Sequence, residues 1–200
     1  MINFYIVGED APSIEIIRKI LREFPQEFCI FREDCKNGYG NIKKAIHKYN
    51  QAAEYIHYFI LTDLDNDPCP SAKINDWLGE ISKNDKLFFR IVVREIESWL
   101  LADKEGFSQF LNIPIANFVN NPDELNDPKN EVFRVVKKSN KRKYKEAILP
   151  NSGASIGPAY NSTIKEFIDN YWDLNRAMKN SPSLKKTIDA LNRYKEEFNS

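Results

Sequence analysis

The sequence has few of the residues that most zinc and nucleophile sites use. It contains two histidines (His47 and His57) and three cysteines (Cys29, Cys35 and Cys69), and no two cysteines have the C-x-x-C spacing. Zinc sites and His-based triads usually need more imidazole or thiol groups than this, so both are poor candidates. A glycine-rich phosphate loop of the P-loop type is also missing, which disfavours a small-molecule phosphotransferase.

An excess of one charge and a long apolar run are missing as well. Lysine plus arginine and aspartate plus glutamate each total 29, so the net charge is zero and no global field favours nucleic acid or a membrane. No apolar run approaches about 18 residues, and the run at residues 2–7 is interrupted too soon for a signal peptide. We expect a soluble, cytoplasmic protein with reduced thiols and no membrane association.

Four short apolar runs predict the strands of an α/β protein. The runs are residues 2–7, 28–31, 58–62 and 87–93. Segments with helical periodicity separate them, and several runs are apolar throughout, which is typical of parallel strands buried on both faces. We therefore expect a three-layer, Rossmann-like α/β fold with a mostly parallel sheet of about four strands.

After residue 103 the pattern becomes helical and loop-rich. Prolines and Asn/Asp turn signals interrupt residues 114–128, and helical patterns then continue to residue 198. No long flexible linker separates this part from the strands. We expect residues 1–103 to form the α/β core and residues 104–200 to form a helical extension packed on it.

The chain is organised around residues 58–67, which read Tyr-Phe-Ile-Leu-Thr-Asp-Leu-Asp-Asn-Asp. Side chains alternate along a strand, so Asp63 and Asp65 point the same way if the extended conformation continues through Leu64. The motif itself contains no lysine or arginine, so a divalent cation is the simplest partner for the two carboxylates, and oxygen ligands suit Mg2+ or Mn2+. The alternative is a solvated acidic turn, in which Asp67 is a turn residue.

Other acidic residues follow the first and last strand signals. Glu9 follows the first, and Glu95 and Glu97 follow the last. Ligands of parallel α/β sheets bind beyond the carboxyl ends of the strands, so we expect these residues to share one crevice with Asp63 and Asp65. A helix that has already begun at Glu95 turns Glu97 about 160° away from it. Only one of the two would then face the crevice, and we favour Glu95.

The order of these acidic motifs resembles that of the Toprim domain, in particular its branch in the OLD (overcoming lysogenisation defect) nucleases. Three segments after strand signals carry the resemblance: Gly8-Glu9-Asp10, Asp63-Leu64-Asp65 and Arg94-Glu95-Ile96-Glu97. The chain is more similar still to an uncharacterised bacterial family of about this length that is linked to phage-defence loci. The further segments shared with that family are Gly38-Tyr39-Gly40, Asp127-Pro128-Lys129, Gly157-Pro158 and Ser181-Pro182-Ser183-Leu184.

The resemblance implies a metal-dependent phosphodiester chemistry that uses Mg2+ or Mn2+. It makes Glu9 the catalytic base or acid, or a metal ligand, and it makes Asp63 and Asp65 metal ligands. It also matches Glu95 and Glu97 to the acids that hold a second metal in OLD-type enzymes. A two-metal site activates the attacking water and stabilises the leaving oxygen.

The first motif departs from the usual Toprim order, because Gly8 precedes Glu9 instead of following it. Either Glu9 or Asp10 therefore faces the predicted site. We interpret Ser13 as the N-cap or a first-turn residue of the following helix, and Asp103 as a helix-end residue.

A basic segment in the second half of the chain is a candidate for phosphate contacts. Residues 134–145 contain seven lysines or arginines and no acid. The residues to which we assign nucleic-acid binding are Arg94, Lys137, Lys138, Lys141, Arg142 and Lys143. The alternative is a solvated helix face. Lys129 is a catalytic candidate together with Glu9 and Glu95, because Arg94 or Lys129 can stabilise charge on a phosphate or pair with ligand carboxylates.

The function expected from the sequence is that of a divalent-metal-dependent nuclease or nuclease-like effector acting on DNA or RNA phosphodiesters. The resemblance adds phage defence as the setting and an ATPase as a possible partner. The alternative is a non-catalytic Toprim-like module that binds nucleic acid, a nucleotide or a partner ATPase. The sequence alone leaves the oligomeric state open.

Overall fold

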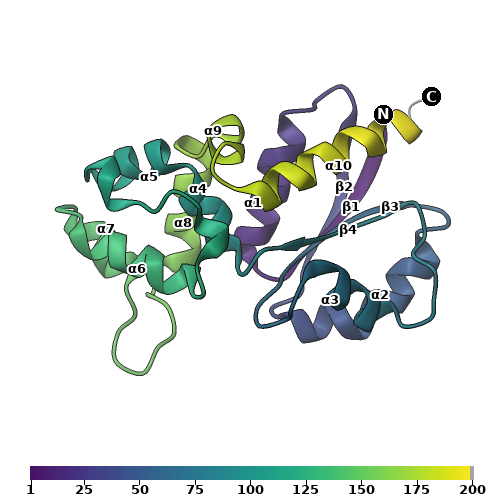
Figure 1. The fold of residues 1–200 in the computed structure, drawn as a ribbon, viewed down its shortest axis with the longest axis horizontal. Helices are drawn as coiled ribbons and strands as arrows, with labels where there is room; N and C mark the ends of the chain where they lie inside the picture. The colour runs from purple at the N-terminus through teal and green to yellow at the C-terminus, as the bar shows by residue number, and fades with distance from the viewer. Residues whose placement is uncertain (199–200) are drawn as a thin grey trace. The chain divides into compact units, whose positions relative to one another are not determined.

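The fold is an α/β fold built on a four-stranded parallel sheet (Figure 1). The computed structural model describes residues 1–198 of the chain. The strands are β1 (Ile2–Gly8), β2 (Phe28–Cys35), β3 (His57–Asp63) and β4 (Leu87–Val92). They lie in the order β2-β1-β3-β4, and all three neighbouring pairs are parallel. The predicted fold class is confirmed.

Strand β2 is longer than its apolar pattern predicted. The apolar run ends at Phe31, but the strand continues through Arg32, Glu33 and Asp34 to Cys35. Because β2 lies at one edge of the sheet, its backbone hydrogen-bonds to β1 while its side chains stay largely exposed. Polar residues are tolerated on such an edge strand, so periodicity did not reveal its full length.

Helices cover both faces of the sheet, giving three layers (Figure 1). On one side lie α1 (Ala11–Arg22) and the later part of α10 (Pro182–Phe198). On the other side lie α2 (Tyr39–Ala52) and α3 (Pro70–Leu78). This arrangement leaves the ends of the strands, rather than the faces of the sheet, as the place for polar side chains.

The two faces of the sheet have separate cores because side chains alternate along each strand. On the α1 and α10 side, Phe4, Phe59 and Phe88 pack together, and Tyr194 of α10 stacks on Phe4. The Nδ1 atom of His57 lies 2.6 Å from the Tyr194 hydroxyl oxygen, which joins α10 to β3.

The core on the α2 and α3 side is one cluster of buried apolar residues. Tyr58, Ile60 and Phe89 contribute to it from β3 and β4, and Trp77 of α3 packs on the ring of Phe89. Leu64, just past the end of β3, belongs to the same cluster. The turn that carries the acidic motif is therefore anchored by a buried residue at its centre.

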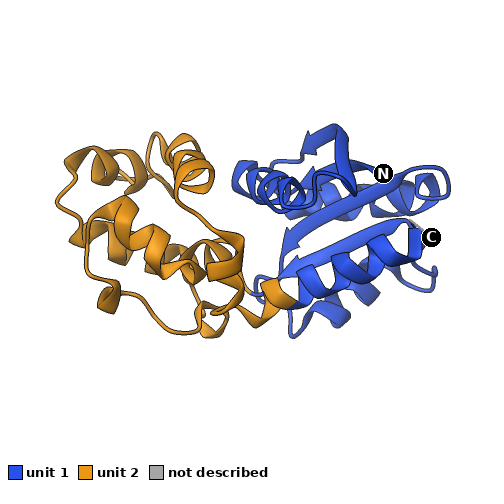
Figure 2. Cartoon of the chain, turned by 90° about the horizontal axis from the view of Figure 1, so that it is seen from above, with its two compact units in different colours: residues 1–93, 186–200 blue, residues 94–185 orange. Residues whose placement is uncertain are grey.

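The chain forms two compact units (Figure 2). The first unit, the sheet unit, comprises residues 1–93 and the chain end from Lys186, so it includes most of α10. The second, the helical unit, comprises residues 94–185. The helical unit therefore begins at Arg94 and not at residue 104 as expected. The last helix, from Lys186 onward, belongs to the sheet unit.

The helical unit consists of short helices and turns around an aromatic core. Its elements are α4 (Ile96–Ala102), α5 (Lys104–Leu111), two 3-10 turns (Ile115–Asn117 and Pro122–Glu124), α6 (Pro128–Lys138), α7 (Arg142–Ile148), α8 (Tyr160–Asn170), α9 (Leu174–Met178) and the first residues of α10. Phe107 and Phe167 stack with ring centroids 4.3 Å apart. The indole of Trp172 donates to the Trp99 carbonyl at 2.9 Å.

Across residues 1–198, no helix is both long enough and apolar enough to cross a membrane.

Candidate carboxylate site

Glu9 and the end of β3 meet at the carboxyl edge of the sheet. Strands β1 and β3 are neighbours, and Gly8 at the end of β1 pairs with Leu61. The next residue, Glu9, accepts a 2.6 Å hydrogen bond from the Thr62 hydroxyl and a 3.3 Å hydrogen bond from the Asp63 amide, both through Oε2. The structure thus brings together two of the predicted site residues, Glu9 and Asp63.

Asp10 points to a different role, as the N-cap of α1. Its Oδ1 accepts hydrogen bonds from the Ser13 amide at 2.9 Å and from the Ser13 hydroxyl at 2.6 Å. Of the two alternatives for the first motif, Glu9 is therefore the residue at the strand end. Of the two interpretations of Ser13, the first-turn residue is confirmed: Ser13 is the third residue of the helix and donates to the cap.

The glycine before Glu9 has a packing reason. A Cβ atom at Gly8 would lie 2.9 Å from two side-chain atoms of Ile14 and 3.0 Å from the Ile14 amide nitrogen. The first turn of α1 therefore passes too close to the end of β1 for any larger residue without a shift. This close approach accounts for glycine at position 8 and leaves the glutamate as the first residue beyond the strand.

The environment of Glu9 favours its protonated form. Burial raises the pKa of Glu9 above its usual value, and the nearby carboxylates of Asp65 and Asp10 raise it further. The hydrogen bonds from Thr62 and Asp63 act in the opposite direction and lower this pKa. A carboxyl group whose pKa is raised at a strand end has the property that acid–base catalysis requires.

Asp63 and Asp65 do not lie on one strand face, because β3 ends at Asp63. Asp63 is the last residue of β3 and is buried, with 7% of its surface exposed. The Leu64 amide still donates to the Val92 carbonyl, but Asp65 has a φ of 52° in the left-handed region. The extended conformation that the expectation required therefore ends before Asp65, so its condition is not met.

Asp65 and Asp67 instead contact a lysine that the sequence reading overlooked. The Lys73 ammonium of α3 lies 3.2 Å from Asp65 Oδ2 and 3.1 Å from Asp67 Oδ2, and it donates to the Leu64 carbonyl at 3.3 Å. Lys73 is buried, with 2% of its surface exposed. Asp67 is thus more than a turn residue, because it shares this cation with Asp65.

A sequence signal for Lys73 did exist. Lys73 and Trp77 are four residues apart, so they lie on the same face of α3, and Trp77 is in the core. A lysine on the apolar face of a helix that follows an acidic turn is a candidate partner for that turn. The pocket beside the turn measures about 490 Å³, and its lining residues include Tyr39, Lys43, Asp65, Lys73 and Trp77.

Glu95 and Glu97 lie in the helical unit, where both contact Lys129. Helix α4 begins at Ile96, and Glu95 is its N-cap with extended backbone (φ −137°, ψ 159°). Glu95 Oε2 accepts a 2.9 Å hydrogen bond from the Lys129 amide in the first turn of α6. The condition under which the two glutamates were expected to diverge, a helix already formed at Glu95, is not met.

Glu97 is fully buried and has two polar neighbours in the same unit. Its Oε1 accepts a 2.7 Å hydrogen bond from the Tyr160 hydroxyl and lies 3.5 Å from the Lys129 ammonium. Of the two roles predicted for Lys129, pairing with a carboxylate is the one that the geometry displays. Tyr160 was not predicted, and only its position beside the Gly157-Pro158 segment marked it.

Asp103 has the helix-end position expected for it, with more partners than a cap needs. It is fully buried, accepts from the Gly106 amide at 3.0 Å and the Asp173 amide at 2.8 Å, and forms a two-pronged ion pair with Arg176. These contacts are internal to the helical unit and fix α5 and α9 in place. Asp103 is a structural carboxylate.

Within each unit, the predicted carboxylates contact different partners. Glu9 contacts the end of β3, Asp65 contacts Lys73, and Glu95 and Glu97 contact Lys129. Within residues 1–198, no three His, Cys, Asp or Glu side chains gather closely enough to hold a metal ion. The shared metal site of the sequence analysis stays a prediction.

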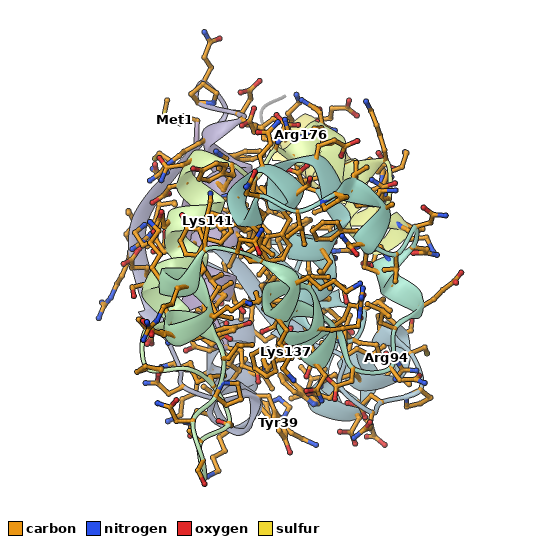
Figure 3. The ribbon with its side chains drawn as sticks, turned by 90° about the vertical axis from the view of Figure 1, so that its left-hand side faces the viewer. Met1, Tyr39, Arg94, Lys137, Lys141 and Arg176 are labelled. Carbon is orange, nitrogen blue, oxygen red and sulfur yellow. The ribbon has the colours of Figure 1, made fainter. Side chains whose placement is uncertain are left out.

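Much of the basic segment has partners inside the protein. Arg134 pairs with Glu131, Arg142 pairs with Glu146, Lys143 lies 3.7 Å from Glu166, and Lys141 donates to the Phe110 carbonyl at 2.7 Å. Lys137 and Lys138 are exposed at the end of α6, and Lys138 donates to Asn117. Figure 3 labels Lys137 and Lys141 on the helical unit, and also Arg94, which has a left-handed backbone (φ 45°).

Comparison with known proteins finds one family. A family model described as a domain of unknown function (DUF4276) matches residues 8–161, well over half of the chain. The matched region includes Glu9, Asp63 and Asp65 of the sheet unit and Glu97 and Lys129 of the helical unit. No curated protein and no solved structure matches the chain.

Proposed function

The chain belongs to the DUF4276 family, a domain of unknown function, and from its site we propose that it is a divalent-metal-dependent phosphodiesterase acting on DNA or RNA. One observation carries the proposal: Glu9, just past the end of β1, accepts a hydrogen bond from the amide of Asp63, the last residue of the neighbouring parallel strand β3. That edge is where ligands of parallel α/β sheets bind.

The residues at the end of β3 suit a Mg2+ or Mn2+ ion that keeps several waters better than an ion enclosed by protein ligands alone. Mg2+ keeps several waters and is usually held by one or two carboxylates together with substrate phosphate oxygens. Asp63 supplies one such carboxylate and is buried, and Glu9, which is partly exposed, contacts its backbone amide. When bound, such an ion supplies Lewis acidity at a phosphate oxygen.

The proposal gives Asp63 and Glu9 different tasks. Asp63, on the last residue of a buried strand, is the principal ligand. Glu9 accepts the proton of the attacking water, because burial raises the pKa of Glu9 and so strengthens it as a base. Thr62 and the Asp63 amide hold one oxygen of Glu9 and thereby orient its carboxylate.

Cleavage and metal binding are measured separately to test this division. Supercoiled plasmid and single-stranded RNA are incubated with the protein in Mn2+, and Mn2+ affinity is measured by calorimetry. Asp63→Asn is expected to abolish Mn2+ binding and cleavage together. Glu9→Gln is expected to retain Mn2+ binding and to lower the cleavage rate by about 100-fold or more.

The matched control is Asp85→Asn, which changes an exposed aspartate just before β4, at the opposite edge of the same sheet. It should leave Mn2+ affinity and cleavage unchanged. Undiminished cleavage by both Asp63→Asn and Glu9→Gln would overturn the proposal. Activity that persists in excess chelator would also overturn it.

A second candidate is a non-catalytic module that binds nucleic acid, a nucleotide or a partner ATPase. It is favoured by one specific observation: Gly8 precedes Glu9 in the first motif, which reverses the usual Toprim order. This candidate predicts nucleic-acid binding without cleavage and without dependence on Mn2+. A partner ATPase and a role in phage defence rest on the resemblance in sequence.

A further inference from the structure

We propose that the Lys73 ammonium is a built-in cation that occupies the oxygen site formed by Leu64, Asp65 and Asp67 and keeps a divalent ion away from these carboxylates. The proposal deepens the proposed function and rests on it for its catalytic meaning, since it identifies which carboxylates of the acidic turn the ion does not use. Its central claim, exclusion of an ion by Lys73, is tested without any measurement of activity.

The contacts of Lys73 are those of a cation in an oxygen cage. Two carboxylate oxygens and one backbone carbonyl lie 3.1 to 3.3 Å from its nitrogen, which are ordinary lengths for an ammonium group. All three oxygens are hard ligands of the kind that Mg2+ and Mn2+ prefer. The acidic turn therefore has the donor set of a divalent site, and the chain itself supplies the cation.

Aromatic rings enclose the same ammonium group. Its nitrogen lies 5.3 Å from the centre of the Tyr39 ring and 5.4 Å from the centre of the Trp77 ring. Tyr39, which Figure 3 labels, comes from the start of α2, whereas Trp77 comes from α3. Both distances suit cation–π attraction, so three separate segments hold the charge of Lys73 in one place.

The depth of Lys73 argues against a chance surface contact. Exposed lysine–aspartate pairs are weak and mobile, whereas a buried ammonium must be compensated by nearby oxygens or rings. Lys43 provides the contrast within the same pocket: its ammonium lies 2.6 Å from Asp76, but 46% of the Lys43 side chain is exposed. Burial holds the Lys73 ammonium in place, whereas Lys43 and Asp76 form an ion pair at the surface.

An ammonium and a divalent ion cannot share this cage. Mg2+ requires oxygens at about 2.0 to 2.1 Å, so it would have to take the space that the ammonium fills and would be repelled by its charge. This leaves Asp63 as the carboxylate of the motif that holds the ion.

The number of Mn2+ ions bound per chain, measured by calorimetry and by loss of the free Mn2+ resonance signal, tests the proposal. Lys73→Met removes the charge and keeps an apolar side chain that suits the space between two rings. We expect Lys73→Met to bind one more Mn2+ than the unchanged chain, and the extra ion to disappear in Lys73→Met/Asp65→Asn. Lys43→Met, the matched control, should bind the same number as the unchanged chain.

A folded Lys73→Met chain that gains no ion would overturn the proposal. If Lys73→Met fails to fold, it is refolded with and without Mn2+: recovery in Mn2+ alone supports the proposal, and failure in both contradicts it. Asp65→Asn in the otherwise unchanged chain should leave Mn2+ binding intact. Loss of Mn2+ binding in this variant would contradict the role proposed for Lys73. If the unchanged chain binds no Mn2+ and Lys73→Met binds one ion, the proposed metal-dependent function is contradicted. The inference about Lys73 is supported by the same result.

Discussion

Thr62 donates a 2.6 Å hydrogen bond to Glu9 Oε2 and so ties the end of β3 to the residue that follows β1. Thr62 is fully buried and immediately precedes Asp63, the residue that we assign to the ion. The Thr62 hydroxyl is therefore part of the site, because it holds one oxygen of the Glu9 carboxylate. The orientation of Glu9 and its proton affinity therefore depend on a neutral side chain.

Replacing the Thr62 hydroxyl by a methyl group is expected to raise the pKa of Glu9 further. Thr62→Val preserves the shape of the side chain and removes the hydrogen bond, which at present lowers that pKa. The shift is followed by carboxyl-carbon NMR as a function of pH. Thr163→Val, at a buried position in the helical unit, is the control and should leave the Glu9 titration unchanged. A fall in the pKa of Glu9 in Thr62→Val would contradict the role given to the hydroxyl.

Glu9→Gln is expected to make the protein more stable at neutral pH while it lowers activity. Burial raises the pKa of Glu9 above its value of about 4.5 in the unfolded chain, so the folded state holds the proton more tightly. Stability therefore falls as the pH rises from about 4.5 through the folded-state pKa, and it stays lower above that window. Glutamine carries no charge, so the variant should escape this loss and gain at most about 1 kcal/mol at pH 7, since Glu9 is partly exposed to solvent.

Urea unfolding at pH 4 and pH 7 measures this gain. The difference between Glu9→Gln and the unchanged chain should be present at pH 7 and small at pH 4. Glu80→Gln, which alters an exposed glutamate after α3, should show no such dependence. An equal effect of Glu9→Gln at both pH values would show that its cause is not the charge of Glu9.

Tyr160→Phe should destabilise the protein by about 2 kcal/mol, because its hydroxyl donates to the fully buried Glu97. Hydrogen bonds to charged groups contribute about 1.5 to 3 kcal/mol, and the substitution removes one without changing the ring. Thermal or urea unfolding gives the free energy, with Tyr55→Phe as the control because 78% of the Tyr55 surface is exposed. Similar, small effects of the two substitutions would show that the contact with Glu97 contributes little.

Local pattern was enough to predict the parallel sheet and the strand-end position of Glu9 and Asp63. The four strands are short and apolar, and the rule that polar groups collect beyond their carboxyl ends needs only their order. The contact between Glu9 and Thr62 depends on β1 and β3 being neighbours, which periodicity does not specify. Their pairing is decided by the packing of whole layers.

The features that the sequence did not predict depend on backbone geometry or on distant partners. Asp65 adopts a left-handed conformation, and that single dihedral changes the direction of the motif. Its partner Lys73 lies on the next helix, eight residues away. The choice between Glu95 and Glu97 depended on a helix already begun at Glu95, but α4 begins one residue later. Such boundaries shift by a residue or two for reasons of capping, which composition does not reveal.

The exposed lysines at the end of α6 provide the clearest test of the predicted nucleic-acid surface. Lys137 and Lys138 lie at the solvent side of that helix, whereas Lys141 and Arg142 are engaged with Phe110 and Glu146. Lys137→Gln/Lys138→Gln should weaken binding of single- and double-stranded oligonucleotides alike and lower the slope of log affinity against log salt by about 2, because each phosphate contact releases about one counterion. Lys44→Gln/Lys48→Gln on α2 removes the same charge from exposed positions of the sheet unit and should leave the slope unchanged. If the two double variants have the same slope, Lys137 and Lys138 do not contact phosphates. That result would favour the alternative interpretation of the basic segment as a solvated helix face.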